Sequence, residues 1–154
     1  MLLYLVQHAE AKKEEDDQAR DLTEKGLLDI ESVAHHLKRL NVKVNRIVHS
    51  GKTRARSTAK ILARHLRPPA GVSEDPELAP LDDPKVWADR LAALDEDILL
   101  VGHLPHLGRL AALLISGDQE RSVINFQMGG AVRLRRMAAN QWAVDWMIVP
   151  ETIL

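Results

Sequence analysis

Met1-Leu2-Leu3-Tyr4-Leu5-Val6-Gln7-His8-Ala9-Glu10 opens the chain, and its apolar run is followed almost at once by a histidine. The apolar part, Leu2–Val6, predicts a buried strand. A second apolar run, Ile98–Val101, leads in the same way to His103, and its unbroken apolar character is typical of a central parallel strand. Because the carboxyl ends of parallel strands form the ligand crevice of an open α/β sheet, we expect His8 and His103 to meet at that edge.

The rest of the chain alternates between strand and helix patterns. Further strands are expected at 44–49, 72–74, 131–137 and 141–149, and helices at 22–40, 52–66, 84–94 and 106–115. Thr23 is the expected N-cap of the first helix, whose predicted buried face consists of Leu27, Ile30, Ala34 and Leu37. Asp83 and Pro84 are expected to begin the third helix.

This order of elements predicts an α/β fold. We expect a three-layer sandwich with a mostly parallel central sheet and an antiparallel edge hairpin, in a single domain of residues 1–154. In the last strand of the hairpin, Trp142 and Trp146 are predicted to share one strand face and to serve in packing.

Composition narrows the classes of function. The formal net charge of −1 provides no general attraction to nucleic acid or to a membrane surface. The sequence has no cysteine, which excludes disulfides, thiolate chemistry and cysteine zinc sites. No apolar run is long enough for a membrane span, and no basic leader precedes the first apolar run. We therefore expect a cytoplasmic protein.

A basic segment follows the second predicted strand. His49-Ser50-Gly51-Lys52-Thr53-Arg54-Ala55-Arg56-Ser57-Thr58 places three cations at the start of a helix. A helix N-terminus favours anions, and cations there oppose the helix dipole, so a bound anion would resolve the conflict. The alternative is a solvated basic helix face, but the shared sheet edge with His8 and His103 favours an anion site.

Four motifs in order resemble the histidine phosphatase superfamily, and more narrowly its short, SixA-type branch of phosphohistidine phosphatases. The family's Arg-His-Ala-Glu after the first strand is similar to Gln7-His8-Ala9-Glu10, and its Leu-Thr-x-x-Gly to Leu22-Thr23-Glu24-Lys25-Gly26. Its Ser-x-x-x-Arg-Ala-x-x-Thr is similar to the segment Ser50–Thr58, and its second catalytic histidine to that of Gly102-His103-Leu104-Pro105. The resemblance implies a phosphoglycerate mutase-like fold.

The resemblance also implies the site. His8 would be the nucleophile that becomes phosphorylated, and His103 would contact the transferring phosphoryl group. Arg54 and Arg20 would bind the phosphate, and the reaction would need neither metal nor cofactor. Lys52 and Arg56 match no family residue, and Arg56 lies about 200° around a regular helix from Arg54 and is expected to point away.

Gln7 departs from the family pattern, which has an arginine directly before the nucleophile. An amide keeps hydrogen-bond donors for the phosphate but loses the charge. Hydrogen bonds to charged groups are worth about 1.5–3 kcal/mol, so we expect weakened activity. The alternative is a non-catalytic relative that binds phosphate or a phosphoprotein.

The expected substrate class depends on a segment that the chain lacks. Larger relatives carry an insert that supplies a carboxylic general acid, and 154 residues leave no room for it. A phosphohistidine substrate needs that acid less than a phosphate ester does, because a protonated imidazole leaves readily. The expected partners are a histidine-phosphorylated protein and inorganic phosphate, and neither nucleic acid nor a membrane. A metal site on His103-x-x-His106 is the least favoured alternative, because Pro105 interrupts the motif.

Overall fold

The computed structural model describes residues 1–153 and contains one six-stranded sheet in the order β3-β2-β4-β1-β5-β6. The strands are β1 (Leu2–Gln7), β2 (Arg46–His49), β3 (Val72–Glu74), β4 (Ile98–Gly102), β5 (Ala131–Arg136) and β6 (Trp142–Ile148). β1, β2, β3 and β4 are mutually parallel, while β5 pairs antiparallel to both β1 and β6. The predicted parallel sheet with an antiparallel edge hairpin is confirmed.

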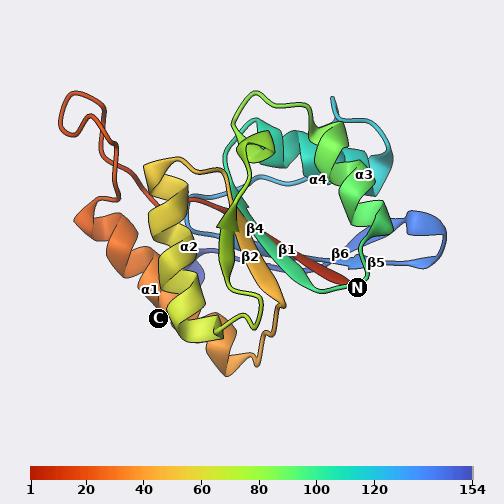
Figure 1. Cartoon of the computed structure of the whole chain (residues 1–154), viewed down its shortest axis with the longest axis horizontal. Helices are drawn as coiled ribbons and strands as arrows, with labels where there is room; N and C mark the ends of the chain where they lie inside the picture. Colours follow the sequence, from red (N-terminus) through yellow and green to blue (C-terminus); the bar gives the residue numbers. More distant parts are fainter. Residues whose placement is uncertain (154) are drawn as a thin grey trace.

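Two layers of helices cover the two faces of the sheet (Figure 1). The helices are α1 (Glu24–Arg39), α2 (Thr53–Leu66), α3 (Pro84–Ala93) and α4 (His106–Ser116). Alternate residues of β1 face opposite layers: Tyr4 and Val6 pack with α1 and α2, and Leu3 and Leu5 pack with α3 and α4. All five residues of β4 are buried, as its apolar sequence predicts for a central strand. The three-layer sandwich follows from this double burial.

The N-terminus of α1 explains the Leu-Thr-x-x-Gly motif. The side chain of Thr23 accepts a hydrogen bond from the backbone N–H of Gly26, so the predicted N-cap is confirmed. A Cβ at Gly26 would lie 2.2 Å from the carbonyl oxygen of Glu10, which only glycine avoids. The predicted buried face of α1 is wrong at Leu27, which is 45% exposed, while Val33 is fully buried in its place.

The edge hairpin overturns one prediction. The pairing between β5 and β6 skips Asp145, which is left as an extra, bulged residue on β6. One extra residue turns the following side chains to the other face of the sheet. Trp146 therefore packs beside Tyr4 on the α1–α2 side, with ring centroids 6.0 Å apart, whereas Trp142 packs on the α3–α4 side. The prediction that the two tryptophans share a strand face is wrong.

The loop between β1 and α1 extends away from the body of the molecule, at the upper left in Figure 1. Its two ends are held together by a bridge between Ala11 and Leu22, and most of the residues between them are exposed. Arg20 lies in this loop with a positive φ of 53°. Within residues 1–153, none of the helices combines the length and apolar character that crossing a membrane requires.

Candidate active site

Two parallel strands bring the two predicted catalytic histidines together. His8 follows β1 and His103 follows β4, which are neighbours in the sheet, and their ring centroids lie 5.0 Å apart. The backbone N–H of His8 donates to the carbonyl of Gly102 at 3.0 Å, so the strand pairing continues up to the histidines. Both imidazoles are buried, with 8% of His8 and 2% of His103 exposed.

The ring of His8 is oriented by its own backbone. Its Nδ1 lies 2.8 Å from the carbonyl oxygen of Ala9, and a carbonyl only accepts, so Nδ1 carries the ring proton. Nε2 therefore keeps its lone pair. The N–H of Ala9 donates to the hydroxyl of Thr58 at 3.0 Å, and that hydroxyl donates to the carbonyl of Arg54 at 2.8 Å. Thr58 thus ties the loop after β1 to the first turns of α2.

Arg54 and Arg20 both act electrostatically on His8. Burial is the largest cause that lowers the pKa of His8 below its usual 6.5, and the charges of both arginines lower it further, against the bond to Ala9, which raises it. Burial and the charge of Arg20 also lower the pKa of Arg54. The Nε of Arg54 is buried without a hydrogen-bond partner within the described residues. Two cations and a buried unpaired donor provide strong attraction for an anion.

His103 is held in its neutral form. Burial lowers its pKa to about 3, with smaller contributions from the charges of His8, Arg54 and Lys52. Its Nε2 lies 2.6 Å from the hydroxyl of Ser50, and its buried Nδ1 has no hydrogen-bond partner in residues 1–153. The nitrogen atom Nδ1 is therefore left for a bound group.

Gln7, the residue that replaces the family's arginine, ends β1 opposite Gly102 of β4. Its side-chain Oε1 is buried and accepts no hydrogen bond from the part of the chain that the structure describes. Its backbone carbonyl accepts from the N–H of Gly129 at 2.9 Å, which fixes the main chain at this position. A half-turn of the amide exchanges oxygen for nitrogen, so Gln7 has an N–H₂ group to offer an anion.

Two other basic residues of the segment differ in their surroundings. Arg56 donates to the carbonyl of Gly51 at 2.9 Å and pairs with Glu74 at 3.3 Å, and its charge lowers the pKa of His49 and is not among the causes for His8 or His103. Lys52 acts on the site, because its charge helps to lower the pKa of His103. Lys52 matches no family motif residue, so this electrostatic effect was missed from sequence.

His106 lies in the core of the α3–α4 layer. It is fully buried, and neither of its ring nitrogens has a hydrogen-bond partner among residues 1–153. Burial lowers its pKa, so the ring is neutral. Among the described residues, no group of three or more histidines, cysteines or carboxylates is arranged to hold a metal ion.

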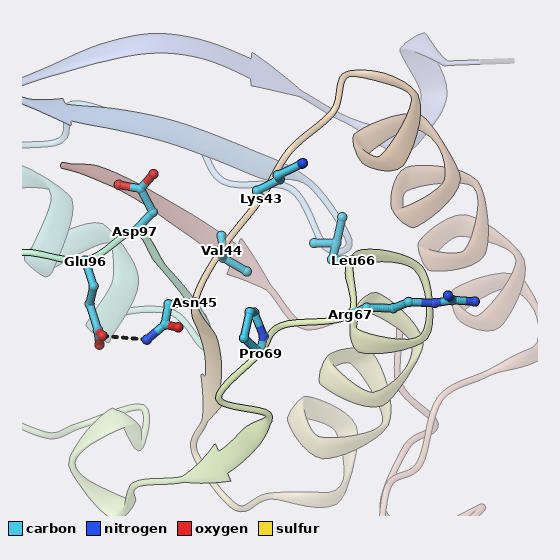
Figure 2. A pocket seen from close by; sticks show the side chains of 8 residues that line it. All are labelled: Lys43, Val44, Asn45, Leu66, Arg67, Pro69, Glu96 and Asp97. Carbon is cyan, nitrogen blue, oxygen red and sulfur yellow. Dashed lines mark hydrogen bonds between the residues drawn. The ribbon is translucent and has the colours of Figure 1, made fainter.

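A hollow of about 540 Å³ lies at the opposite edge of the sheet (Figure 2). It is lined by Lys43, Val44, Asn45, Leu66, Arg67, Pro69, Glu96 and Asp97, which precede strands or end α2. Asn45 donates to Glu96 at 2.7 Å across it, and the side chains of Lys43 and Arg67 extend outward. None of the predicted site residues lines this hollow, so the strand carboxyl ends form the candidate site.

Comparison with known proteins shows the family of this chain. Residues 3–82 match the family model of the histidine phosphatase superfamily, branch 1. The chain belongs to the histidine phosphatase superfamily. An uncharacterized protein of Picosynechococcus is 37% identical over 90% of this chain and 87% of its own length. The phosphohistidine phosphatase SixA of Escherichia coli is 29% identical over 77% of this chain and 76% of its own.

The fold places the chain in the SixA-type branch of the histidine phosphatases. The structure of the protein histidine phosphatase SixA with tungstate superposes with a TM-score of 0.88 at 25% identity, over 99% of both chains. The predicted phosphoglycerate mutase-like fold and the predicted family are confirmed. Membership of this histidine phosphatase family makes the chain a phosphatase.

The family motif contains two residues to which no function was assigned from sequence. Ser50 and Thr58 are the first and last residues of the Ser-x-x-x-Arg-Ala-x-x-Thr motif, and in the structure one contacts His103 and the other holds the backbone beside His8. The motif itself was the signal, because its serine and threonine are motif positions that the phosphate-binding Arg54 does not account for.

The lowered pKa values of the histidines predict acid sensitivity. Between pH 6.5 and about 3, the unfolded chain takes up protons at His8 and His103 that the folded chain does not, so stability falls as pH falls through that window. When urea unfolding is measured at pH 6.5 and again at pH 5, the free energy of unfolding of His103→Gln is expected to fall by roughly 1 kcal/mol less than that of wild type, because the variant has no imidazole at this position to take up a proton on unfolding. Equal losses in both proteins would contradict the neutral assignment of His103.

Proposed function

We propose that this chain hydrolyses phosphohistidine in a protein substrate through a phosphorylated His8. The observation that supports the substrate class is electrostatic: within residues 1–153, no carboxylate is among the charges that shift the pKa of His8, His103 or Arg54. A phosphate ester needs a general acid for its alkoxide, whereas phosphohistidine leaves as an imidazole once protonated. The site therefore suits a phosphoramidate better than an ester.

Several carboxylates in the loops after β1 and β3 have other partners. Glu10 accepts from the hydroxyl of Thr23 at 3.3 Å, at the start of α1. In the loop after β3, Asp75 pairs with Arg90, and Asp83 caps α3. These contacts support a site without a general acid.

The proposed reaction has two displacements. In the first, the lone pair of His8 Nε2 attacks phosphorus and the P–N bond of the substrate breaks. The substrate ring, protonated on its other nitrogen before the attack, leaves as a neutral imidazole that keeps the electron pair of the broken bond. In the second, water attacks phosphorus, the bond to His8 Nε2 breaks, and inorganic phosphate is released with His8 neutral again. Covalent capture divides one difficult displacement into two easier ones.

The cations of the site stabilise charge on the transferring group. Phosphoryl transfer depends mainly on positioning and on electrostatic stabilisation of the equatorial oxygens. In the proposal, Arg54 and Arg20 supply the charge, His103 supplies a hydrogen bond, and Gln7 supplies an uncharged donor. The lowered pKa of His8 keeps the nucleophile unprotonated at neutral pH. Because Gln7 carries no charge, the proposal includes a rate below that of a site with an arginine there.

Phosphate release tests the substrate class. We expect a histidine-phosphorylated protein to give a kcat/KM at least about 100-fold above that of the same protein phosphorylated on serine, since general acid catalysis is worth roughly 10²–10⁴ to a poor leaving group. Non-enzymatic loss of phosphohistidine, measured in parallel with His8→Ala, is subtracted. Equal rates on the two phosphoproteins, or a preference for the ester, would overturn the phosphohistidine assignment.

A further inference from the structure

Ser50 makes a close contact with the second histidine of the site. Its hydroxyl lies 2.6 Å from Nε2 of His103, and both side chains are buried. The two residues follow the neighbouring parallel strands β2 and β4, so the pairing of the sheet brings them together. Ser50 Oγ also accepts the backbone N–H of Lys52 at 3.3 Å. The hydroxyl is therefore oriented from two sides.

These contacts leave the hydroxyl proton of Ser50 free to be donated to His103. A serine hydroxyl has one proton to donate and two lone pairs with which to accept. Because Oγ already accepts from Lys52, its proton is available to Nε2 of His103. A neutral imidazole carries a single N–H, so a ring whose Nε2 accepts from Ser50 carries its proton on Nδ1.

Both rings carry their proton on Nδ1, but opposite nitrogens are left for a bound group: Nε2 of His8 and Nδ1 of His103. At His8 the carbonyl of Ala9 takes the Nδ1 proton and leaves a lone pair on Nε2. At His103 the buried Nδ1 has no hydrogen-bond partner in residues 1–153, and a buried N–H requires one. Attack on phosphorus needs a lone pair, whereas binding a phosphoryl oxygen needs a donor. The two rings, 5.0 Å apart, are thus set for different tasks.

We propose that Ser50 is a positioning residue that fixes His103 as its Nδ1–H tautomer and so provides a neutral hydrogen-bond donor for the phosphoryl group transferred to His8. The inference rests on the proposed function, since it assigns His103 a partner in that reaction. His8 presents a lone pair as nucleophile, and His103 presents an N–H as donor. His103 then needs no proton uptake before the reaction, and no imidazolium has to form in a site that already holds cations.

Nitrogen NMR of the ligand-free protein at neutral pH tests the tautomers directly, because protonated and unprotonated ring nitrogens have well-separated shifts. Wild type is expected to show His8 with a free Nε2, and His103 with an unprotonated Nε2 that accepts a hydrogen bond. In Ser50→Ala, the His103 signals are expected to move toward the Nε2–H form, and in Ser50→Thr, which keeps the hydroxyl, they are expected to stay. An Nε2–H form of His103 in wild type would overturn the proposal without any variant.

Kinetics provide the second measurement. Ser50→Ala is expected to lower kcat about 3- to 12-fold with KM unchanged within about twofold, which is the range of one neutral hydrogen bond. Ser50→Thr is expected to restore most of kcat. Ser116→Ala, which removes a hydroxyl bonded to the backbone at the far end of α4, is the control and is expected to match wild type.

The two proposals fail in distinguishable ways. If wild type releases no phosphate from any phosphoprotein while the NMR signals show the expected tautomers, the proposed function is wrong and the assignment to Ser50 stands as a structural fact. If wild type is active while Ser50→Ala keeps both the His103 tautomer and kcat, the inference about Ser50 is wrong. If Ser50→Ala does not fold, Ser50→Cys, with a weak donor of similar volume, replaces it in both measurements.

Discussion

Replacing His8 with alanine is expected to abolish phosphate release, by at least roughly 10³-fold in kcat. The reason is that the bond from Nδ1 of His8 to the carbonyl of Ala9 leaves a lone pair on Nε2. Without that lone pair, the covalent route has no first step. Wild type quenched during turnover is expected to carry a phosphoryl group on His8 that is stable to base and lost in acid. Mass spectrometry of the quenched peptide measures both.

His35→Ala is the matched control for this experiment. His35 is an exposed histidine on α1, so its removal changes the histidine count without touching the site. It is expected to leave both turnover and the trapped phosphoryl group unchanged. A His8→Ala protein with wild-type activity, or a phosphoryl group found on another residue, would mean that the nucleophile has been assigned wrongly.

Gln7→Arg is expected to raise kcat/KM about 10- to 150-fold, from the 1.5–3 kcal/mol that a charged hydrogen bond contributes. The new side chain would start from the end of β1, where the buried Oε1 of Gln7 has no partner among the described residues. A guanidinium there offers two parallel N–H groups and a charge to the phosphate oxygens. Phosphate release from the histidine-phosphorylated protein measures the gain.

The same substitution has a predicted cost in the empty site. A third cation beside Arg54 and Arg20 repels both, so Gln7→Arg is expected to be less stable than wild type without an anion and to gain more stability from added phosphate. Gln7→Met, which removes the amide, serves as the uncharged control and is expected to be slower than wild type. A loss of activity in Gln7→Arg would show that the site is built around the amide, and phosphate binding without turnover in both proteins would favour a binding protein.

Much of this site could be predicted from local sequence, because it depends on where strands end. The apolar runs before His8 and His103 identify two parallel strands, and the loops at the carboxyl ends of parallel strands meet at one edge of the sheet. The helix starts at Thr23 and Asp83 were also predictable, since capping is a contact within four residues.

The features that were missed depend on contacts between distant segments. The contact of Ser50 with His103 exists because β2 lies beside β4, and the sequence order of strands does not reveal their order in the sheet. The bulge at Asp145 adds one residue to β6. A prediction that assumes strict alternation of side chains along the strand therefore puts Trp142 and Trp146 on the same face. Leu27 was assigned to the core from its spacing, although the first turn of α1 lies at the edge of the packed layer.

The site is divided between a central and a peripheral part of the molecule. His8 and His103 are attached to β1 and β4, which are paired on both sides in the sheet, and strands of this kind open only with global unfolding. Arg20 lies in a mostly exposed loop. The contacts that hold this loop include the bridge between Ala11 and Leu22, a bond from Arg20 Nε to the carbonyl of Lys12, and a bond from the hydroxyl of Ser57 to Asp21. Elements with so few buried contacts open locally at much lower free energy. We therefore expect the amide protons around Arg20 to exchange with solvent faster than those around His8 and His103, and local opening of the loop to leave the spacing of the two imidazoles unchanged.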